Sequence, residues 1–242
     1  MKYIIFNWKS YLNLKETSSL SKLIASIPKS KKHKIISAPN NFFHLSIQAK
    51  YIKNALAAQN LDLHGLGAST GSLDISFLKD SKIKYCILGH SEVRSNFKDT
   101  DNTVAKKLDL CISSNITPIV CIGESKSVYK SKNTKKFLKT QIDCIFDKKT
   151  SYKEIIVAYE PVWAIGTGVT ASPEQAQSVH LFIRSLLGEG NETIAQTTPI
   201  LYGGSMNAGN ANELIACPDI DGGLIGGAAL KAEDFLHICK AG

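Results

Sequence analysis

Residues 155–168, Ile-Ile-Val-Ala-Tyr-Glu-Pro-Val-Trp-Ala-Ile-Gly-Thr-Gly, contain the clearest fold signal of this chain. The first of them, 155–159, are apolar or aromatic, a run typical of a strand buried on both faces of a parallel sheet. Pro161 has no backbone N–H and disfavours helical torsion angles at Glu160, so the strand is predicted to end there. The segment indicates an α/β fold in which a carboxylate stands where a strand stops.

The residues after Glu160 predict a lid. Val162 and Trp163 begin a loop more apolar than a solvated connector, and Gly166 and Gly168 can absorb the torsion changes of a hinge. A carboxylate covered by such a loop has its charged form disfavoured, which raises its pKa toward the range of a general base. A Glu-Pro pair alone is more often a simple turn, but the tryptophan and the paired glycines favour a catalytic role for Glu160.

Length and composition are typical of a globular protein. The chain has 242 residues, of which 43% are hydrophobic, and no Pro/Ser-rich linker divides it, so one domain over residues 1–242 is expected. The apolar run after Lys2 is too short for a signal peptide, and no run is long enough to span a membrane, so a cytoplasmic location without a membrane partner is expected. The six cysteines lack Cys-x-x-Cys spacing and are expected to be reduced, mostly buried thiols.

The charge pattern favours a small anionic partner over nucleic acid. The net charge is +8, but the lysines are scattered and lack interleaved aromatic residues that could stack on bases. Nucleic acid is therefore not an expected partner, whereas a phosphorylated small molecule would be steered by the positive charge.

Strand and helix patterns alternate about eight times. Division of 242 residues by this number gives units of about thirty residues, the size of the repeat in a (β/α)8 barrel. An open doubly wound sheet is the alternative, but no Gly-x-Gly-x-x-Gly follows the first strand. The expected strands are Tyr3–Phe6, Ile35–Ala38, Ala55–Gln59, Tyr85–Leu88, Pro118–Ile122, Ile155–Tyr159, Ile200–Tyr202 and Gly223–Ile225, and the clearest helices are Glu16–Ile27, Asp101–Ser113, Thr134–Phe146, Pro173–Leu187 and Ala211–Ala216.

Polar residues follow several of these strands. In a barrel the carboxyl ends of the strands surround one site, so Asn7, Lys9, His90 and Glu160 are expected to meet there. Either Lys9 or His90 alone would more often be a surface or structural residue. Glycine pairs follow the last two strands, at residues 203–204 and 226–227, where backbone amides can approach a phosphate.

These motifs resemble the triosephosphate isomerase family, and the resemblance covers essentially the whole chain. The matching segments, in order, are Asn7-Trp-Lys9, Gly89-His-Ser-Glu92, Ala158-Tyr-Glu-Pro-Val-Trp-Ala-Ile-Gly-Thr-Gly168, Tyr202-Gly-Gly-Ser205 and Gly226-Gly227. The resemblance implies a (β/α)8 barrel that interconverts dihydroxyacetone phosphate and D-glyceraldehyde 3-phosphate in glycolysis and gluconeogenesis, without cofactor or metal.

The resemblance also implies roles for single residues. Glu160 would be the base and His90, as a neutral imidazole at a helix N-terminus, the electrophile. Lys9 and Asn7 would bind and orient the substrate. Glu92 either shares protons in the site or holds Lys9 in position, and the second role is favoured. The phosphate would be held by Gly166 of the lid, Ser205, Gly226 and Gly227.

Assembly is where the chain departs from the family pattern. The resemblance implies a homodimer in which the loop Gly67–Asp74 enters the neighbouring subunit, with Thr70 close to that subunit's asparagine and lysine. Ser72 stands where an acidic residue is usual, and Val93 stands where an arginine is usual. Because both members of a charged contact are replaced, a dimer held mainly by apolar contact is expected. Ser10 and Ala229 are smaller departures.

Two rival functions remain open from the sequence. One is another sugar-phosphate isomerase on the same barrel, which substrate tests would separate. The other is a barrel that binds phosphate without catalysis, which would require Glu160 or His90 to be absent or misplaced. Both residues are present in the chain.

Overall fold

The eight strands form one closed parallel barrel in which sequential strands are neighbours. The computed structural model describes residues 1–26, 32–40, 55–146, 154–166, 170–189 and 192–241. The closed order confirms the predicted (β/α)8 barrel and excludes the open sheet. The strands are β1 (Lys2–Asn7), β2 (His33–Ala38), β3 (Ala55–Ala58), β4 (Tyr85–Leu88), β5 (Thr117–Ile122), β6 (Ile156–Tyr159), β7 (Ile200–Tyr202) and β8 (Gly222–Ile225).

Closure of the barrel depends on a glycine. β8 pairs with β1 so that Gly222 faces Tyr3. Gly222 has φ 141°, and a Cβ there would lie 1.8 Å from the carbonyl oxygen of Tyr3. Only a residue without a side chain allows the last strand to approach the first so closely.

Both faces of each strand are buried, as the apolar runs predicted. Ile5 belongs to a cluster built from alternate residues of the strands, which fills the barrel. Its neighbours Ile4 and Phe6 belong to a second cluster that includes helix residues, and the Phe6 ring stacks on that of Phe235 at 4.0 Å. The strands are therefore packed on their inner face against one another and on their outer face against helices.

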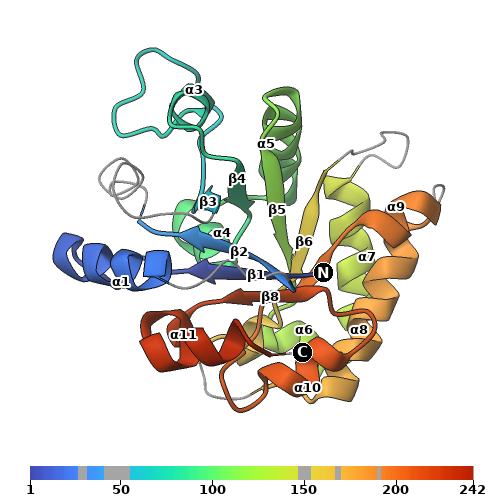
Figure 1. The fold of residues 1–242 in the computed structure, drawn as a ribbon. Coiled ribbons are helices and arrows are strands. Elements are labelled where there is room, and N and C mark those ends of the chain that lie inside the picture. The colour runs from blue at the N-terminus through green and yellow to red at the C-terminus, as the bar shows by residue number, and fades with distance from the viewer. Residues whose placement is uncertain (27–31, 41–54, 147–153, 167–169, 190–191, 242) are drawn as a thin grey trace.

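Helices surround the strands (Figure 1). None of the helices in the described ranges is long and apolar enough to cross a membrane. The helices are α1 (Leu14–Ser26), α3 (Ile75–Asp80), α4 (Ser91–Phe97), α5 (Asp101–Ser113), α6 (Lys126–Lys130), α7 (Thr134–Ile145), α8 (Pro173–Leu187), α9 (Glu192–Thr197), α10 (Ala211–Ala216) and α11 (Ala232–Ile238), with 3₁₀ turns η2 (Val162–Ala164) and η3 (Gly227–Leu230).

Some predicted boundaries differ from those observed, and capping explains one of them. α1 begins at Leu14 rather than Glu16, because the Asn13 side chain accepts from Glu16 N and Glu16 Oε2 accepts from Asn13 N. This reciprocal cap starts the helix earlier than the apolar pattern indicates. The predicted end of this helix at Ile27 lies outside the described residues.

β2 begins at His33, two residues before its predicted start, and the other boundary errors are single residues. Gln59 and Ile155 lie just outside β3 and β6, and Phe146 is an extended residue after α7 rather than its last turn. Of the six cysteines, Cys86, Cys111, Cys121 and Cys239 are buried, which agrees with the expected packing role.

Candidate active site

Asn7 and Lys9 are held at the end of β1 by hydrogen bonds that fix an unusual backbone. Asn7 is buried, and its Oδ1 accepts from the Lys9 backbone N–H at 3.0 Å. Lys9 has φ 48°, a left-handed conformation that is unfavourable for a residue with a side chain. Gln59 Nε2 donates to the carbonyl oxygens of Lys9 and Ala38, both at 2.9 Å. These contacts keep Lys9 in a position that its backbone alone would not favour.

The Lys9 side chain points across the barrel mouth to Glu92. Lys9 Nζ donates to Glu92 Oε1 at 2.6 Å, and the two side chains are 15% and 47% exposed. The pairing is the one expected if Glu92 positions Lys9. Because Glu92 is half exposed, the pair contributes more to the direction of the lysine than to the free energy of folding.

His90 precedes the first turn of α4, and this position assigns its tautomer. Its Nδ1 accepts from the Glu92 backbone N–H at 3.2 Å. In a neutral ring the proton then lies on Nε2, which is 3.0 Å from Glu160 Oε1. His90 thus presents an N–H donor toward the carboxylate that follows β6.

Glu160 is 2% exposed at the end of β6. Its Oε2 accepts from the Ser91 backbone N–H at 2.9 Å. The first turn of α4 therefore supplies a backbone donor to Glu160 and another to His90. Burial raises the pKa of Glu160, and this desolvation outweighs the lowering effects of His90, of the Ser91 hydrogen bond and of the more distant Lys9 and Arg94. A carboxylate of this kind is a stronger base than an exposed one.

A cavity of about 220 Å³ lies between these groups and the two glycine pairs. This volume is smaller than the ~300–1,000 Å³ of drug-sized pockets and suits a small substrate. A Cβ at Gly203 would lie 2.9 Å from Glu160 Cγ, and one at Gly226 would lie 3.3 Å from Lys9 Cε. Gly203 therefore leaves room for Glu160, whereas a side chain at residue 226 would require Lys9 to shift by a few tenths of an ångström. The cavity lining includes Asn7, Lys9, His90, Glu160, Gly166, Ser205, Gly226 and Gly227, which are all the predicted site residues.

The start of the predicted lid is anchored to the barrel through η2. Trp163 Nε1 donates to Glu124 Oε1 at 2.8 Å, and the Trp163 ring stacks on Tyr129 at 4.1 Å. The Tyr159 hydroxyl lies 3.1 Å from both Glu124 oxygens. Burial raises the pKa of Glu124, and the hydrogen bonds from Trp163 and Tyr159 oppose that rise.

The start of the lid also contacts the loop after β7. Ser205 Oγ donates to the Ala164 carbonyl oxygen at 2.7 Å, so its hydroxyl contacts the lid. Beyond the lid, the Ala171 backbone N–H donates to the Tyr202 hydroxyl at 3.2 Å. Gly166 has φ 68°, a conformation suited to glycine at a hinge. The predicted hinge residue Gly168 lies outside the described residues.

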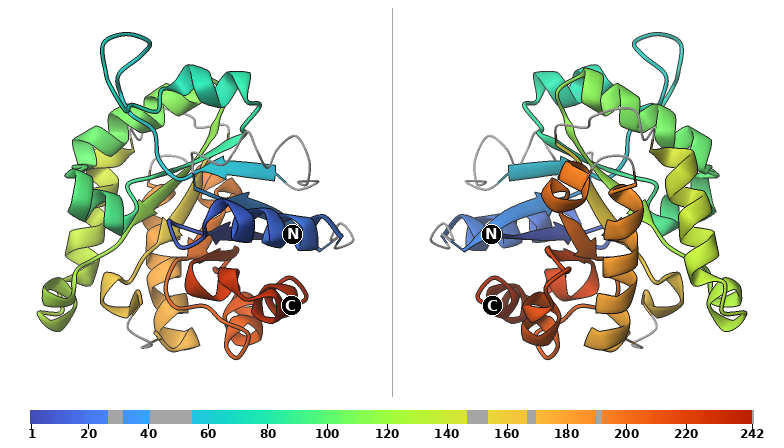
Figure 2. Two further views of the ribbon diagram at one scale, coloured as in Figure 1. Left: turned by 90° about the vertical axis from the view of Figure 1, so that its left-hand side faces the viewer. Right: turned by 90° about the vertical axis from the view of Figure 1, so that its right-hand side faces the viewer.

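A larger cavity of about 960 Å³ adjoins the same mouth. It shares Asn7, Lys9 and His90 with the smaller cavity and extends to Thr70 and Val93. Its lining includes residues 70–73 of the loop Gly67–Asp74, which we call the docking loop. The segment between β3 and α3 that contains it projects from the barrel (Figure 2).

Two residues that support the site were not predicted from the sequence. Gln59 supports Lys9, and Glu124 anchors Trp163. Both follow a strand, β3 and β5, so the rule that polar residues at carboxyl strand ends serve the site would have found them.

Comparison with known proteins gives consistent results over the full chain. The family model described as Triosephosphate isomerase matches residues 2–242. The triosephosphate isomerase of Ruthia magnifica subsp. Calyptogena magnifica is 48% identical, with all of both chains covered. Those of Colwellia psychrerythraea and Thiobacillus denitrificans are each 43% identical, over 97% and 99% of this chain and 95% and 98% of theirs.

Proposed function

Since this chain belongs to the triosephosphate isomerase family, we propose that Glu160 and His90 carry out its interconversion of dihydroxyacetone phosphate and D-glyceraldehyde 3-phosphate. The observation that carries the proposal is the buried contact of 3.0 Å between His90 Nε2 and Glu160 Oε1 beside the small cavity. A base and a hydrogen-bond donor in contact are the two groups that an enediolate mechanism needs.

The reaction moves a carbonyl group to the neighbouring carbon. Glu160 takes a proton from the carbon next to the carbonyl, while the N–H of His90 donates to the oxygen on which negative charge develops. His90 passes its Nε2 proton to that oxygen and takes the hydroxyl proton from the neighbouring oxygen, so the ring ends neutral again. Glu160 returns its proton to the other carbon, which restores the carboxylate. A substrate oxygen beside His90 Nε2 would accept the hydrogen bond that Glu160 now accepts.

Lys9 and Asn7 bind and orient the substrate in this proposal. The Lys9 ammonium places a fixed positive charge at the mouth of the small cavity, and the buried Asn7 lines its wall. The left-handed backbone of Lys9, held by Gln59, supports a functional role, because strain of this kind persists only where surrounding contacts impose it.

The phosphate group is held by the two glycine loops and the lid. The backbone amides of Gly226 and Gly227 after β8, of Ser205 after β7 and of Gly166 in the lid would donate to it, since all four residues line the small cavity. Closure of the lid would exclude water and protect the enediolate from loss of phosphate.

The remaining expectations concern the whole protein. We infer one catalytic domain over residues 1–242 that acts in the cytoplasm in glycolysis and gluconeogenesis, with no cofactor, metal, nucleic acid or membrane partner. We also infer a homodimer. The docking loop carries no charged residue from Gly67 to Leu73, it projects beside the large cavity, and Phe97 near that cavity is 73% exposed. A second copy of this chain would cover these groups.

A coupled assay on the purified chain tests the proposed activity. We expect turnover of dihydroxyacetone phosphate and glyceraldehyde 3-phosphate in both directions, without added metal or cofactor. Pentose phosphates are the comparison substrates, because a longer sugar does not suit a cavity of about 220 Å³. Faster turnover of a pentose phosphate than of either triose phosphate would favour the rival isomerase.

A further inference from the structure

The docking loop is held in shape by a carboxylate of its own chain. Asp62 N donates to the Leu73 carbonyl oxygen at 2.9 Å, which joins the two ends of the loop segment. Asp62 Oδ2 accepts from Leu73 N at 2.8 Å and from Ser72 Oγ at 3.1 Å. Ser72 Oγ in turn accepts from Ser69 Oγ at 3.0 Å. These bonds form a connected set from the base of the loop toward its tip.

The backbone of the loop turns sharply above this set of bonds. Ser72 N donates to the Ser69 carbonyl oxygen at 3.2 Å, and Gly71 between them has φ 84°. A tight turn closed by its own hydrogen bonds loses little conformational freedom when a partner binds. The hydrogen bonds to Asp62 therefore preorganise the docking loop for binding a partner.

We propose that Asp62 is a positioning residue for assembly, which fixes the docking loop through Ser72 and Leu73 so that a second copy of this chain can bind it. The inference rests on the homodimer proposed above. Asp62 acts on the loop of its own subunit, and no charge across the subunit contact is needed.

The same geometry explains why position 72 holds a hydroxyl rather than an acid. The Ser72 oxygen donates to a carboxylate oxygen 3.1 Å away. A carboxylate at residue 72 would replace that donor with a second negative charge, and like charges at this distance repel. In this chain Asp62 and an acid at position 72 are therefore incompatible, whereas Asp62 and Ser72 are complementary.

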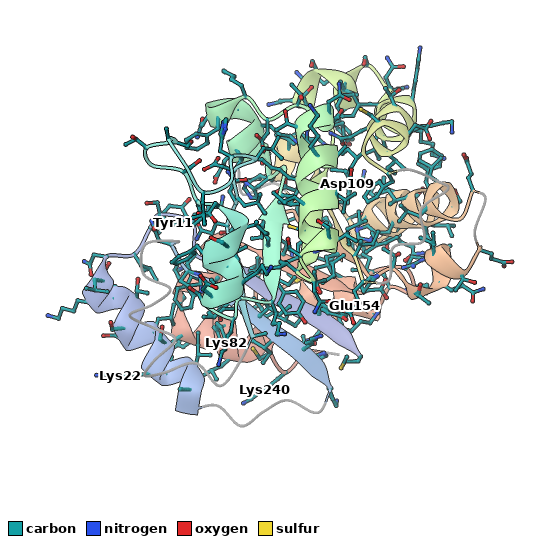
Figure 3. The ribbon with its side chains drawn as sticks, turned by 90° about the horizontal axis from the view of Figure 1, so that it is seen from above. Tyr11, Lys22, Lys82, Asp109, Glu154 and Lys240 are labelled. Carbon is teal, nitrogen blue, oxygen red and sulfur yellow. The ribbon has the colours of Figure 1, made fainter. Side chains whose placement is uncertain are left out.

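A set of substitutions at these two positions tests the proposal. Ser72→Asp should raise the dimer dissociation constant by about tenfold or more, because it removes one hydrogen bond and adds repulsion. Asp62→Asn alone should change it by less than about threefold, because the amide oxygen can accept the same two bonds. The double variant Asp62→Asn/Ser72→Asp should bind at least about threefold more tightly than Ser72→Asp, because the like-charge repulsion is removed while the amide oxygen can still accept from Leu73 N. Asp109→Asn on α5 (Figure 3) is the control for loss of one negative charge.

The dissociation constants are measured by sedimentation over a concentration series. Ser72→Asp with parental affinity, or a double variant no tighter than Ser72→Asp, would overturn the proposal. A parent chain that is monomeric at all concentrations would also overturn it, and the isomerase assay would be unaffected by that result.

Hydrogen exchange separates the shape of the loop from direct contact with the partner. At concentrations where every variant is monomeric, the Leu73 amide should exchange faster in Ser72→Asp than in the parent, and the double variant should restore slow exchange. If Leu73 exchange is equal in all monomers while dimer affinity changes, residue 72 acts on the partner directly and the positioning role is wrong.

Discussion

Two glutamates at opposite ends of the same strand differ in every property that matters for catalysis. Glu154 precedes β6, is exposed, and accepts from Thr117 Oγ1 at 3.1 Å. Glu160 follows β6, is 2% exposed, and contacts His90 and the Ser91 amide. The comparison shows that residue type alone does not make a base, because burial and the donors that face the side chain differ between the two ends.

The lysines at the two ends show the same contrast. Lys34 at the amino end lies over the rings of Tyr3 and Tyr85, at 5.4 and 5.2 Å from their centroids. These groups and Glu154 line a cavity of about 120 Å³ in which polar groups contact one another. Lys9 at the carboxyl end has a left-handed backbone imposed by its neighbours. The amino end is thus built for stability, whereas the carboxyl end holds groups in less favourable states.

The largest expected effect separates the two glutamates. Glu160→Gln should lower kcat by about 10²–10⁴-fold with the fold retained, because the amide cannot take a proton. Glu154→Gln makes the same chemical change at the other end and should alter kcat by less than about twofold. Steady-state kinetics with both triose phosphates measure both values. Equal losses of kcat in the two variants would contradict the distinction between the two ends of β6.

The second-largest expected effect separates Lys9 from Lys34. Lys9→Met should lower kcat/KM by about 10²–10³-fold, because a fixed charge near the substrate oxygens is lost. Lys34→Met should leave kcat/KM within about twofold and lower the free energy of unfolding by about 0.5–1 kcal/mol, the contribution of the cation over its aromatic rings. Denaturant unfolding and kinetics on the same samples test the pair. A large kinetic loss in Lys34→Met would mean that the amino end also serves the reaction.

A shortened lid should change the products as well as the rate. Deletion of Ala164, Ile165 and Gly166 keeps Trp163 and Glu124, which contact each other, but removes lid residues that line the small cavity. Isomerisation should fall by about tenfold or more, and the released enediolate should eliminate phosphate to give methylglyoxal. Both products are measured, with Glu154→Gln as the control. Slower isomerisation with no rise in methylglyoxal would contradict a protective lid.

The smallest expected effect concerns assembly at the carboxyl end. Val93→Arg should raise the dimer dissociation constant by about tenfold, because an unpaired charge would enter the proposed contact, and residues 67–73 of the docking loop carry no charge to pair with it. Val93→Met is the control for size. The proposed dimer of the parent chain should respond little to added salt, because the contact inferred for it is mainly apolar. Steep dissociation of the parent in salt would contradict this account of the contact.

Much of the difference between the amino and carboxyl ends of the barrel could be predicted from the sequence. The apolar runs gave the strands because each is buried on both faces, and Pro161 marked the end of β6. The order of strands then brought Asn7, Lys9, His90 and Glu160 to one mouth. The start of α8 is also encoded locally, by the capping box of Ser172 and Gln175.

Other features depend on contacts that no local pattern encodes. α4 and α6 have no buried residue, so no apolar stripe marks them in the sequence. The role of Gln59 depends on the adjacency of β1, β2 and β3, because its side chain joins Lys9 to Ala38. The link from Asp62 to Ser72 depends on the fold of a loop in which the two residues are neighbours only after the chain turns back.

The ionisation of Glu160 tests the central claim most directly. The claim is that burial at the carboxyl end of β6 makes this glutamate a base, and burial raises its pKa above the ordinary value of 4.5. Carbon-13 NMR of the chain with labelled glutamate, with the Glu160 signal assigned by its loss in Glu160→Gln, gives the pKa by titration. The account predicts a Glu160 pKa above 4.5, so that the carboxyl group is protonated and inactive as a base on the acid side of that value. A Glu160 pKa at or below 4.5 would contradict it.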